Sequence, residues 1–355
     1  MSMVRSKLSR CLVISAASLV LALVASAGAL ANSGAIGAPM QATLSYMQTA
    51  TKPAKSYRIA YIAVCLSNPY CTKLQQGVKD AAAKYGATFK MFDAEFNRAT
   101  QHKQVQDAIA QKFDAYLLAP VTQSGGCADY KLLLKTGKPV EVHNIPICKY
   151  ADYPPGANGF VAMQGQKYFT DHVMNAFASC AKPCEIAAVG GFIGSDLFTL
   201  WENAIKLAQA KYPNAHLVVD QPGNFVPRAA FKVIQDALQA HPKISVVVSS
   251  WDDMTRGVVQ AIQAAHKKPG KDIRIYSVGG TKDALAKINA GIMTETTVVL
   301  PYEEGYYPIV QLVKRLATGK ATPGYTDERD APAVTEGPKT LFITKANASQ
   351  FKPEY

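Results

Sequence analysis

Short apolar runs and longer amphipathic segments alternate along this chain in two successive sets. Continuous apolar runs, such as those at 59–64 and 244–248, are typical of parallel strands that are buried on both faces. The segments between the runs carry apolar residues at helical spacing, for example Leu74, Val78 and Tyr85. This alternation predicts an α/β fold with two doubly wound parallel-sheet lobes.

Each set predicts its own strands and helices. The first set has strands at 59–64, 88–92, 115–119 and 139–143, and helices at 73–85, 100–111 and 129–136. The second has strands at 160–163, 185–189, 216–219, 244–248, 273–278, 294–300 and 341–344, and helices at 166–179, 197–212, 228–240, 254–266, 282–290 and 305–317. Ligands bind outside the carboxyl ends of the strands in such sheets, so two facing edges predict a cleft.

The N-terminus predicts a secretory signal peptide over residues 1–31. Arg5, Lys7 and Arg10 precede an apolar run, and the run ends in small residues around Ala31. This is the charged, apolar, small-residue order of a cleavable export signal. An uncleaved membrane anchor is the alternative, because the run is about long enough to span a bilayer.

Cleavage at that point leaves six of the seven cysteines in the mature chain. An even cysteine count in an exported chain argues for disulfides, although six cysteines allow 15 connectivities. Local spacing favours Cys65–Cys71 and Cys180–Cys184, which leaves Cys127–Cys148. The alternative is a zinc site, but no C-x2-C pair occurs and no histidine lies at ligand spacing.

Charge and motifs argue against nucleic-acid binding and catalysis. The net charge of +12 is spread along the chain without a block of like charges, which indicates a solvated surface. The phosphate-loop pattern, the G-x-S-x-G elbow and H-E-x-x-H are absent. The glycine-rich stretch 190–194 lacks the G-x-G-x-x-G spacing and predicts a tight turn. We therefore predict no catalytic residue, no metal ligand and no cofactor, and hold an exported enzyme as a minor alternative.

Polar and aromatic residues directly follow several predicted strands. Among them are Asn-Pro-Tyr within CLSNPYC (65–71), Trp-Asp-Asp within VVVSSWDDMTRGVVQAIQAA, and the turn of IYSVGGTKDALAKINAG. With these segments the chain resembles the type I periplasmic solute-binding proteins of ABC importers, of the ribose-, galactose- and xylose-binding kind. The resemblance runs from about Tyr57 to Thr318 and is most specific in its first quarter.

The resemblance implies roles for the loop at 65–71. Asn68 is expected to donate a ligand hydrogen bond, and Tyr70 to cover one face of a sugar ring. A Cys65–Cys71 disulfide would limit the motion of this loop and lower the ordering cost of binding. The alternative is that Asn68 and Pro69 form a turn and Tyr70 packs beneath it.

Other candidate ligand-binding residues depart from the usual polar pattern of the family. The candidates are Asn68, Tyr70, Asn144, Gln164, Trp201, Trp251, Asp252, Thr281 and Leu300. Asn144 and Gln164 stand where sugar binders usually carry aspartates. Tryptophan, threonine and leucine replace other clamp groups: Trp201 stands in place of an arginine, Trp251 of an asparagine, Thr281 of an aspartate and Leu300 of a glutamine. Trp201 also fits a helical pattern that faces the core.

These departures predict a charge-free, aromatic-lined cleft. Each hydroxyl buried there without a partner costs about 1–3 kcal/mol, which disfavours a densely hydroxylated sugar. The cleft therefore favours a less polar or partly aromatic solute, or a deoxygenated sugar.

The resemblance also implies the organisation and role of the chain. The expected parts are a loose leader at 32–56, an N-terminal lobe at 57–163 plus about 301–329, and a C-terminal lobe at 164–300 plus about 330–355. A three-strand hinge joins the lobes near Gln164, Leu300 and 325–335. The implied function is a periplasmic monomer that captures a small solute and delivers it to an ABC permease. The alternative is a ligand sensor that presents its bound state to a sensor kinase or chemoreceptor.

Overall fold

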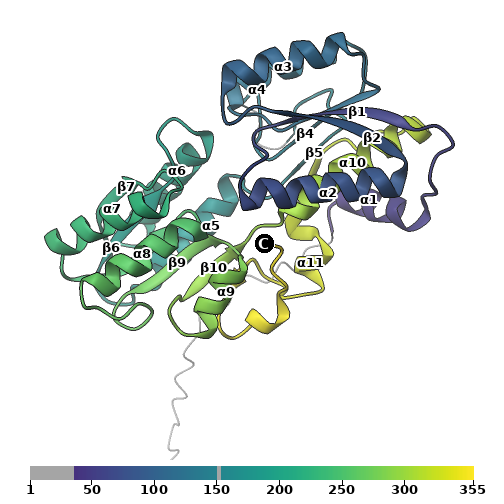
Figure 1. Ribbon diagram of the computed structural model, residues 1–355. Helices are drawn as coiled ribbons and strands as arrows, with labels where there is room; N and C mark the ends of the chain where they lie inside the picture. The colour runs from purple at the N-terminus through teal and green to yellow at the C-terminus, as the bar shows by residue number, and fades with distance from the viewer. Residues whose placement is uncertain (1–35, 150–152) are drawn as a thin grey trace, which may run out of the picture.

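The computed structural model describes residues 36–149 and 153–355, which form two α/β lobes, each built on one sheet (Figure 1). The predicted signal peptide at 1–31 lies outside these residues. Two sheets of mostly parallel strands confirm the predicted fold class. None of the helices in the described ranges has the length and apolar character that a membrane span requires.

Both sheets have the doubly wound order. The first sheet is entirely parallel, in the order β11 (Tyr325–Asp327), β5 (Gly159–Ala162), β4 (Val140–His143), β3 (Ala115–Leu118), β1 (Tyr57–Ala63) and β2 (Ala87–Asp93). The second has the order β12 (Phe342–Ile343), β10 (Glu295–Val298), β9 (Arg274–Gly279), β8 (Ile244–Ser249), β6 (Cys184–Gly190) and β7 (Ala215–Pro222), with only β12 antiparallel.

Helices cover the faces of each sheet (Figure 1). The first lobe carries α1 (Ala38–Thr49), α2 (Pro69–Tyr85), α3 (Arg98–Ala110), α4 (Gln123–Leu134) and α10 (Pro301–Thr318). The second lobe carries α5 (Gln166–Ala178), α6 (Asp196–Lys211), α7 (Pro227–Ala240), α8 (Asp252–Ala264) and α9 (Lys282–Asn289). The short elements η1 (Glu328–Asp330), α11 (Pro332–Thr335) and η2 (Ala348–Gln350) follow β11.

The described chain passes three times between the lobes. It leaves the first sheet after β5, returns after β10 to form α10, and leaves again between β11 and β12. The first two passages are short, because α5 begins at Gln166 and α10 at Pro301. The lobes are therefore joined by backbone at one common edge, which leaves the carboxyl ends of their strands facing each other.

Helices α2 and α4 of the first lobe, like α3 and α10, begin earlier than the sequence pattern predicts. The helix expected from residue 73 begins at Pro69, because Asn68 caps it and proline is well tolerated at the first helical position. The helix expected from residue 129 begins at Gln123, where the Thr122 hydroxyl accepts from the Gly125 amide. A Cβ at Gly125 would lie 1.7 Å from the Arg98 side chain, so glycine leaves room for this arginine beside the start of the helix.

The segment expected as a loose leader at 32–56 contains helix α1. Met40 and Thr43 of this helix are fully buried beside α10 and β11. The Gln311 amide donates to the Thr43 hydroxyl over 2.9 Å, and the Gly37 amide donates to Asp330 over 2.8 Å. The weak periodicity of the segment hid this helix, because only a narrow strip of it is buried.

Helices α2 and α10 cross at backbone contact. A Cβ on Gly305 would lie 2.1 Å from the Leu74 carbonyl oxygen, and a Cβ on Gly77 would lie 2.0 Å from the Tyr302 carbonyl oxygen. The two glycines therefore allow a closer approach than any side chain permits. This crossing holds the first turn of α10, which follows the second passage between lobes, against α2.

We predict that Gly305→Ala lowers the free energy of unfolding by about 1–3 kcal/mol, because the added methyl group forces the two helices apart. Gly165→Ala is the matched control, since a Cβ at Gly165 meets open space and its φ of −90° suits any residue. Denaturant unfolding measures both variants. Equal stabilities would contradict the close crossing.

Candidate functional site

A cavity of about 200 Å³ lies between the lobes at the carboxyl ends of their strands. Its wall is made of residues that follow the strands β1 to β8. The first lobe contributes Val64, Cys65, Asn68, Pro69, Tyr70, Phe96, Pro120, Val121, Asn144 and Ile145. Gln164 comes from the first passage, and the second lobe contributes Phe169, Gly191, Phe192, Ser195, Asp196, Leu197, Phe225, Ser250, Trp251 and Asp253.

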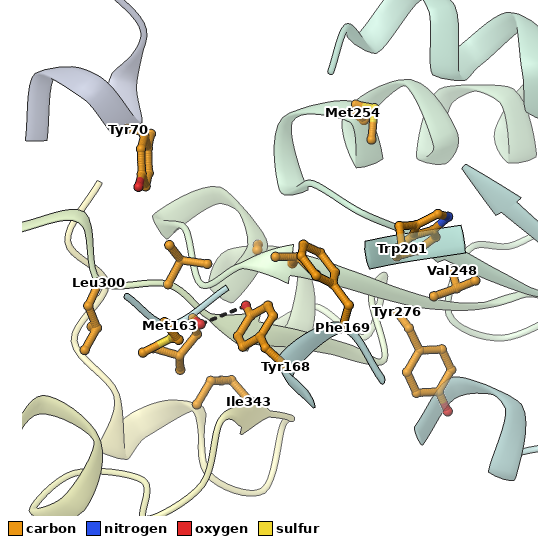
Figure 2. Packing of buried hydrophobic residues seen from close by; sticks show 14 of the residues in the cluster. Tyr70, Met163, Tyr168, Phe169, Trp201, Val248, Met254, Tyr276, Leu300 and Ile343 are labelled. Atoms are coloured by element: carbon orange, nitrogen blue, oxygen red, sulfur yellow. Dashed lines mark hydrogen bonds between the residues drawn. The ribbon is translucent and has the colours of Figure 1, made fainter. Parts of the chain in front are cut away.

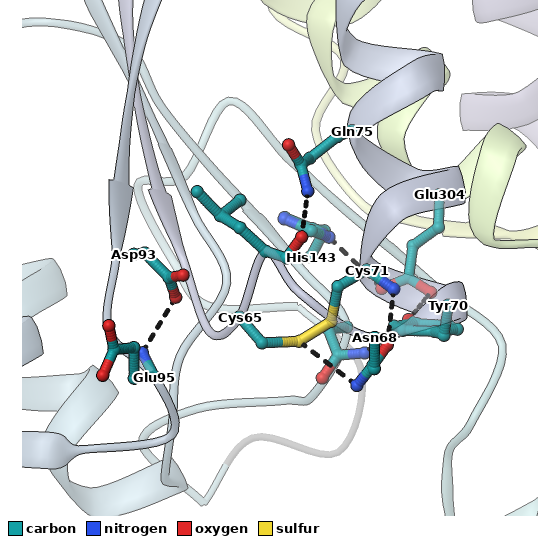
Figure 3. The surroundings of a disulfide bond; sticks show 11 residues. Cys65, Asn68, Tyr70, Cys71, Gln75, Asp93, Glu95, His143 and Glu304 are labelled. Carbon is teal, nitrogen blue, oxygen red and sulfur yellow. Dashed lines mark hydrogen bonds and ion pairs between the residues drawn. A yellow bond between two sulfur atoms is a disulfide. The ribbon is translucent and has the colours of Figure 1, made fainter.

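The Cys65–Cys71 disulfide holds the loop that carries Asn68 and Tyr70 (Figure 3). It links the end of β1 to the first turn of α2. The Asn68 side-chain oxygen accepts from the Cys71 amide over 2.8 Å and thereby caps the helix. Its Nδ2 group remains near the Cys65 sulfur, at 3.8 Å, on the wall of the cavity.

The structure pairs all six described cysteines as the spacing favours. Cys127–Cys148 joins α4 to the loop that follows β4, close to the wall residues Asn144 and Ile145. Cys180–Cys184 lies between α5 and β6 and does not line the cavity. Disulfides therefore restrain loops of the first-lobe wall, whereas the described second-lobe wall carries none.

Tyr70 is buried in a polar network rather than stacked on a free surface. Its hydroxyl donates to Glu304 of α10 and accepts from the Asn144 amide over 2.9 Å. Burial and the nearby Glu304 carboxylate raise the pKa of Tyr70 well above its usual value. The other Glu304 oxygen lies 3.2 Å from Nδ1 of His143. The network fixes the Tyr70 ring at one side of the cavity.

Trp251 belongs to the second-lobe wall of the cavity and contacts Tyr70 of the first-lobe wall. The centroids of the two rings are 5.9 Å apart, and their planes meet at 79°. Because Tyr70 belongs to α2 and Trp251 precedes α8, this edge-to-face pair joins the two lobes.

Asp252 and Thr281 support the wall from behind instead of lining it. The Asp252 carboxylate accepts from the Thr281 amide over 3.0 Å and from the Thr296 hydroxyl over 2.9 Å. Burial raises the pKa of Asp252, and the hydrogen bonds from Thr281 and Thr296 oppose this rise. A Cβ on Gly279 would lie 2.5 Å from Asp252, so glycine is required in this turn. Their effect on a ligand would be indirect, through the start of α8.

Trp201 and Leu300, two further candidates, are fully buried and do not line the cavity. Figure 2 shows Trp201 beside Phe169 within the packed cluster of the second lobe. The ring centroids of Trp201 and Phe169 are 6.4 Å apart, and His172 lies 6.1 Å from Trp201 on another side. Trp201 therefore occupies the core position that its helical spacing also allowed, one layer behind the ligand wall.

Four phenylalanines of the wall were missed by sequence reasoning. They are Phe96, Phe169, Phe192 and Phe225. Phe96 and Phe225 follow β2 and β7 and both have a left-handed backbone, with φ of 58° and 54°. This conformation is uncommon for bulky residues and turns both rings into the cavity. The signal that could have found three of them, Phe96, Phe192 and Phe225, is their place directly after predicted strands.

The cavity also carries carboxylates, which corrects the expectation of a charge-free cleft. Asp196 and Asp253 lie in the first turns of α6 and α8, where helix N-termini favour acidic residues. Asp196 accepts from the Gln123 amide of α4 over 2.5 Å, so it bridges the lobes. Asp253 pairs with Arg256 at 3.2 Å.

Gln164 and Ser250 offer free hydrogen-bonding groups to a solute. Within the described part of the chain, the Gln164 amide has no hydrogen-bond partner and the buried Ser250 hydroxyl has none either. Both line the cavity. No cluster of three potential metal ligands occurs among the described residues. The aromatic rings of the wall, its side-chain amides and the Ser250 hydroxyl can together bind an uncharged solute.

Fold and site define a two-lobed solute-binding protein. A family model described as a periplasmic binding protein domain matches residues 59–321, and the chain belongs to this family. The chain is 26% identical over 236 residues to the galactofuranose-binding protein YtfQ of Escherichia coli (strain K12), covering 64% of this chain and 72% of that protein. It is 26% identical over 270 residues to the ribose import binding protein RbsB of Bacillus subtilis (strain 168), covering 75% of this chain and 81% of that protein.

A solved structure has the same fold. It is the periplasmic binding protein component of the arabinose ABC transporter from Shewanella sp. ANA-3, bound to α- and β-L-arabinofuranose. The TM-score is 0.65 at 26% identity, covering 79% of this chain and 95% of that chain. These findings confirm the predicted family and support substrate capture and delivery to a permease over the sensor alternative. They identify the protein as a periplasmic solute-binding protein and not an enzyme.

We predict that Trp251→Ala weakens solute binding by about 1–3 kcal/mol, because a ring of the cavity wall is lost. Trp201→Phe should lower the melting temperature and leave the affinity unchanged, because Trp201 lies in the core. Titration calorimetry and thermal unfolding separate the two effects. A loss of affinity in Trp201→Phe alone would place the site elsewhere.

We predict that the double variant Cys65→Ser/Cys71→Ser binds solute more weakly, because the wall loop must then be ordered on binding. The variant Cys180→Ser/Cys184→Ser is the control, since that pair does not line the cavity. Each should lose about 2 kcal/mol of folding stability, as expected for a short closed loop. Equal affinities in the two variants would show that the disulfide at Cys65 has no role in binding.

Proposed function

We propose that the interlobe cavity binds a small, sugar-like solute that carries fewer hydroxyls than a free hexose. The observation that carries this proposal is the composition of the wall, in which six aromatic rings outnumber the free polar groups. Rings cover the apolar faces of a sugar, whereas each buried hydroxyl needs a partner of its own. A cavity of about 200 Å³ also favours a solute smaller than a typical drug molecule.

The relatives support the sugar-like part of the proposal. Galactofuranose, ribose and arabinofuranose are named for the three proteins compared above. In this chain the side-chain amides of Asn144 and Gln164 would hydrogen-bond the hydroxyls at the edge of the sugar, since each amide can both donate and accept. Asn144 already donates one amide hydrogen to Tyr70, so its oxygen and its second amide hydrogen are left for a solute hydroxyl.

We also propose that the lobes close on the solute by rotation about the three passages between them. The moving units are the N-terminal lobe (57–163 with about 301–329) and the C-terminal lobe (164–300 with about 330–355), and α1 moves with the first. Three further predictions accompany this proposal: a cleaved signal peptide at 1–31, a monomeric state, and an ABC permease as the partner. A sensor kinase partner has no observation in its favour.

We predict that a pentose or a deoxy sugar raises the melting temperature of the protein more than D-galactose or myo-inositol does, because the latter two carry more hydroxyls that need partners. A solute present at 100 times its dissociation constant stabilises the folded state by about 2.7 kcal/mol. The panel for a thermal-shift screen contains L-arabinose, D-ribose, D-galactose, 6-deoxy sugars, myo-inositol and small aromatic alcohols. A shift confined to the aromatic alcohols would refute the sugar-like ligand and leave solute capture intact.

The solute with the largest shift is then used in two controls. Small-angle scattering should show a smaller radius of gyration with it than without it, because the lobes close. Incubation should return the solute unchanged. A scattering curve that is identical in both states would contradict closure.

A further inference from the structure

Segment 351–355 is attached to the second lobe. The Phe351 ring packs against the Gly280 turn, since a Cβ on that glycine would lie 3.0 Å from it. The Lys282 amide, in the first turn of α9, donates to the Tyr355 carbonyl oxygen over 2.8 Å. The Tyr355 hydroxyl donates to the Gly279 carbonyl oxygen over 3.3 Å. Backbone and side chain of Tyr355 are thus both held by the loop after β9.

The same segment reaches the first lobe. The Glu354 carboxylate accepts from the Tyr302 amide, in the first turn of α10, over 2.6 Å. Tyr355 shares a surface concavity with Pro69 and Thr72 of α2. Figure 1 shows this end of the chain between the two lobes. Segment 351–355 therefore spans the junction on the side of the cavity that faces the passages.

Tyr355 completes a cluster of three rings behind the cavity. Its ring centroid lies 6.2 Å from that of Trp251 and 6.4 Å from that of Tyr70. Tyr70 and Trp251 are themselves 5.9 Å apart, so each ring touches the other two. Tyr70 and Trp251 line the cavity, whereas Tyr355 does not. Each ring comes from a different part of the chain: α2, the loop before α8, and segment 351–355.

The direction of the Trp251 ring depends on packing. Trp251 stands at the N-cap of α8, yet its side chain makes no cap hydrogen bond. The ring is only partly buried, and Tyr70 and Tyr355 are the aromatic neighbours that hold it. Removing one of them leaves a space into which the indole can turn. Tyr70, by contrast, is also held by hydrogen bonds to Glu304 and Asn144.

We propose that Tyr355 is a positioning residue of the binding site: its ring fixes Trp251 against Tyr70, so that both walls of the cavity keep their orientation. This inference rests on the proposed binding site, because it assigns a role through two residues of that wall. Tyr355 thus supports the ligand wall of the second lobe, to which it is attached. Glu354 of the same segment contacts the first turn of α10 in the first lobe. The Tyr355 ring is tilted at 31° to the Trp251 ring and the Tyr70 ring meets it at 79°, and aromatic pairs at these centroid distances attract each other enough to set the direction of an otherwise free ring.

The test uses acrylamide quenching of tryptophan fluorescence in the full protein without solute. Trp201 is fully buried, so the quenchable emission comes from Trp251. Tyr355→Ala should raise the quenching constant about two-fold and shift the emission to longer wavelength, because one of the two covering rings is lost. Tyr355→Phe keeps the ring and should behave like the unaltered protein. Lys352→Ala, an exposed position in the same segment, is the control.

Two results would overturn the inference. Unchanged quenching in Tyr355→Ala, with or without a lower melting temperature, would show that Tyr355 has only a structural role. Raised quenching in both Tyr355→Ala and Tyr355→Phe would show that the hydroxyl bond to Gly279, and not the ring, holds Trp251. The readout needs no solute, so failure of the sugar screen and failure of this inference are separate outcomes.

Discussion

The hydroxyl of Tyr70 is the point at which the binding wall and the junction between lobes meet. It donates to Glu304, which lies in the first turn of α10 just after the second passage, and it accepts from Asn144 at the end of β4. The glycine crossing of α2 and α10 places these groups within reach, because Gly305 stands next to Glu304 in that turn. A displacement of the Tyr70 ring would therefore act, through its hydrogen bond to Glu304, on the first turn of α10, which directly follows the second passage between the lobes.

Two other contacts hold the lobes together through carboxylates at helix N-termini. Asp196 of the second lobe accepts from the first amide of α4, and Glu354 accepts from the second amide of α10. Amides in the first turn of a helix have no partner within the helix, and the helix dipole favours a negative charge there. One contact lies at the cavity wall and the other beside the passages. Under the proposed rotation, opening of the lobes breaks the first contact, whereas the second can persist as a pivot.

The sequence predicted the strands of both sheets except β11, because most buried parallel strands in this chain are continuous apolar runs. It also predicted the wall residues Asn68, Tyr70, Asn144, Gln164 and Trp251, which all follow strands. Helix starts were predicted late at α2 and α4, where caps and a proline extend the helix beyond its apolar pattern. Trp201, Thr281 and Leu300, which the resemblance placed in the binding site, are buried and do not line the cavity.

Phe96 and Phe225 were missed for a physical reason, which is that side-chain direction in loops depends on backbone conformation. Phe96 and Phe225 reach the cavity only because two consecutive residues in each loop have positive φ, Glu95 with Phe96 and Asn224 with Phe225. Neither loop has a glycine at those positions, which would have indicated a positive φ. Apolar periodicity carries no information on the backbone conformation of a loop. The same turn occurs after β2 in one lobe and after β7 in the other, at equivalent places in the two sheets. An aromatic ring thus enters the cavity from corresponding loops of both lobes, so the proposed closing rotation would bring the two rings toward a bound solute.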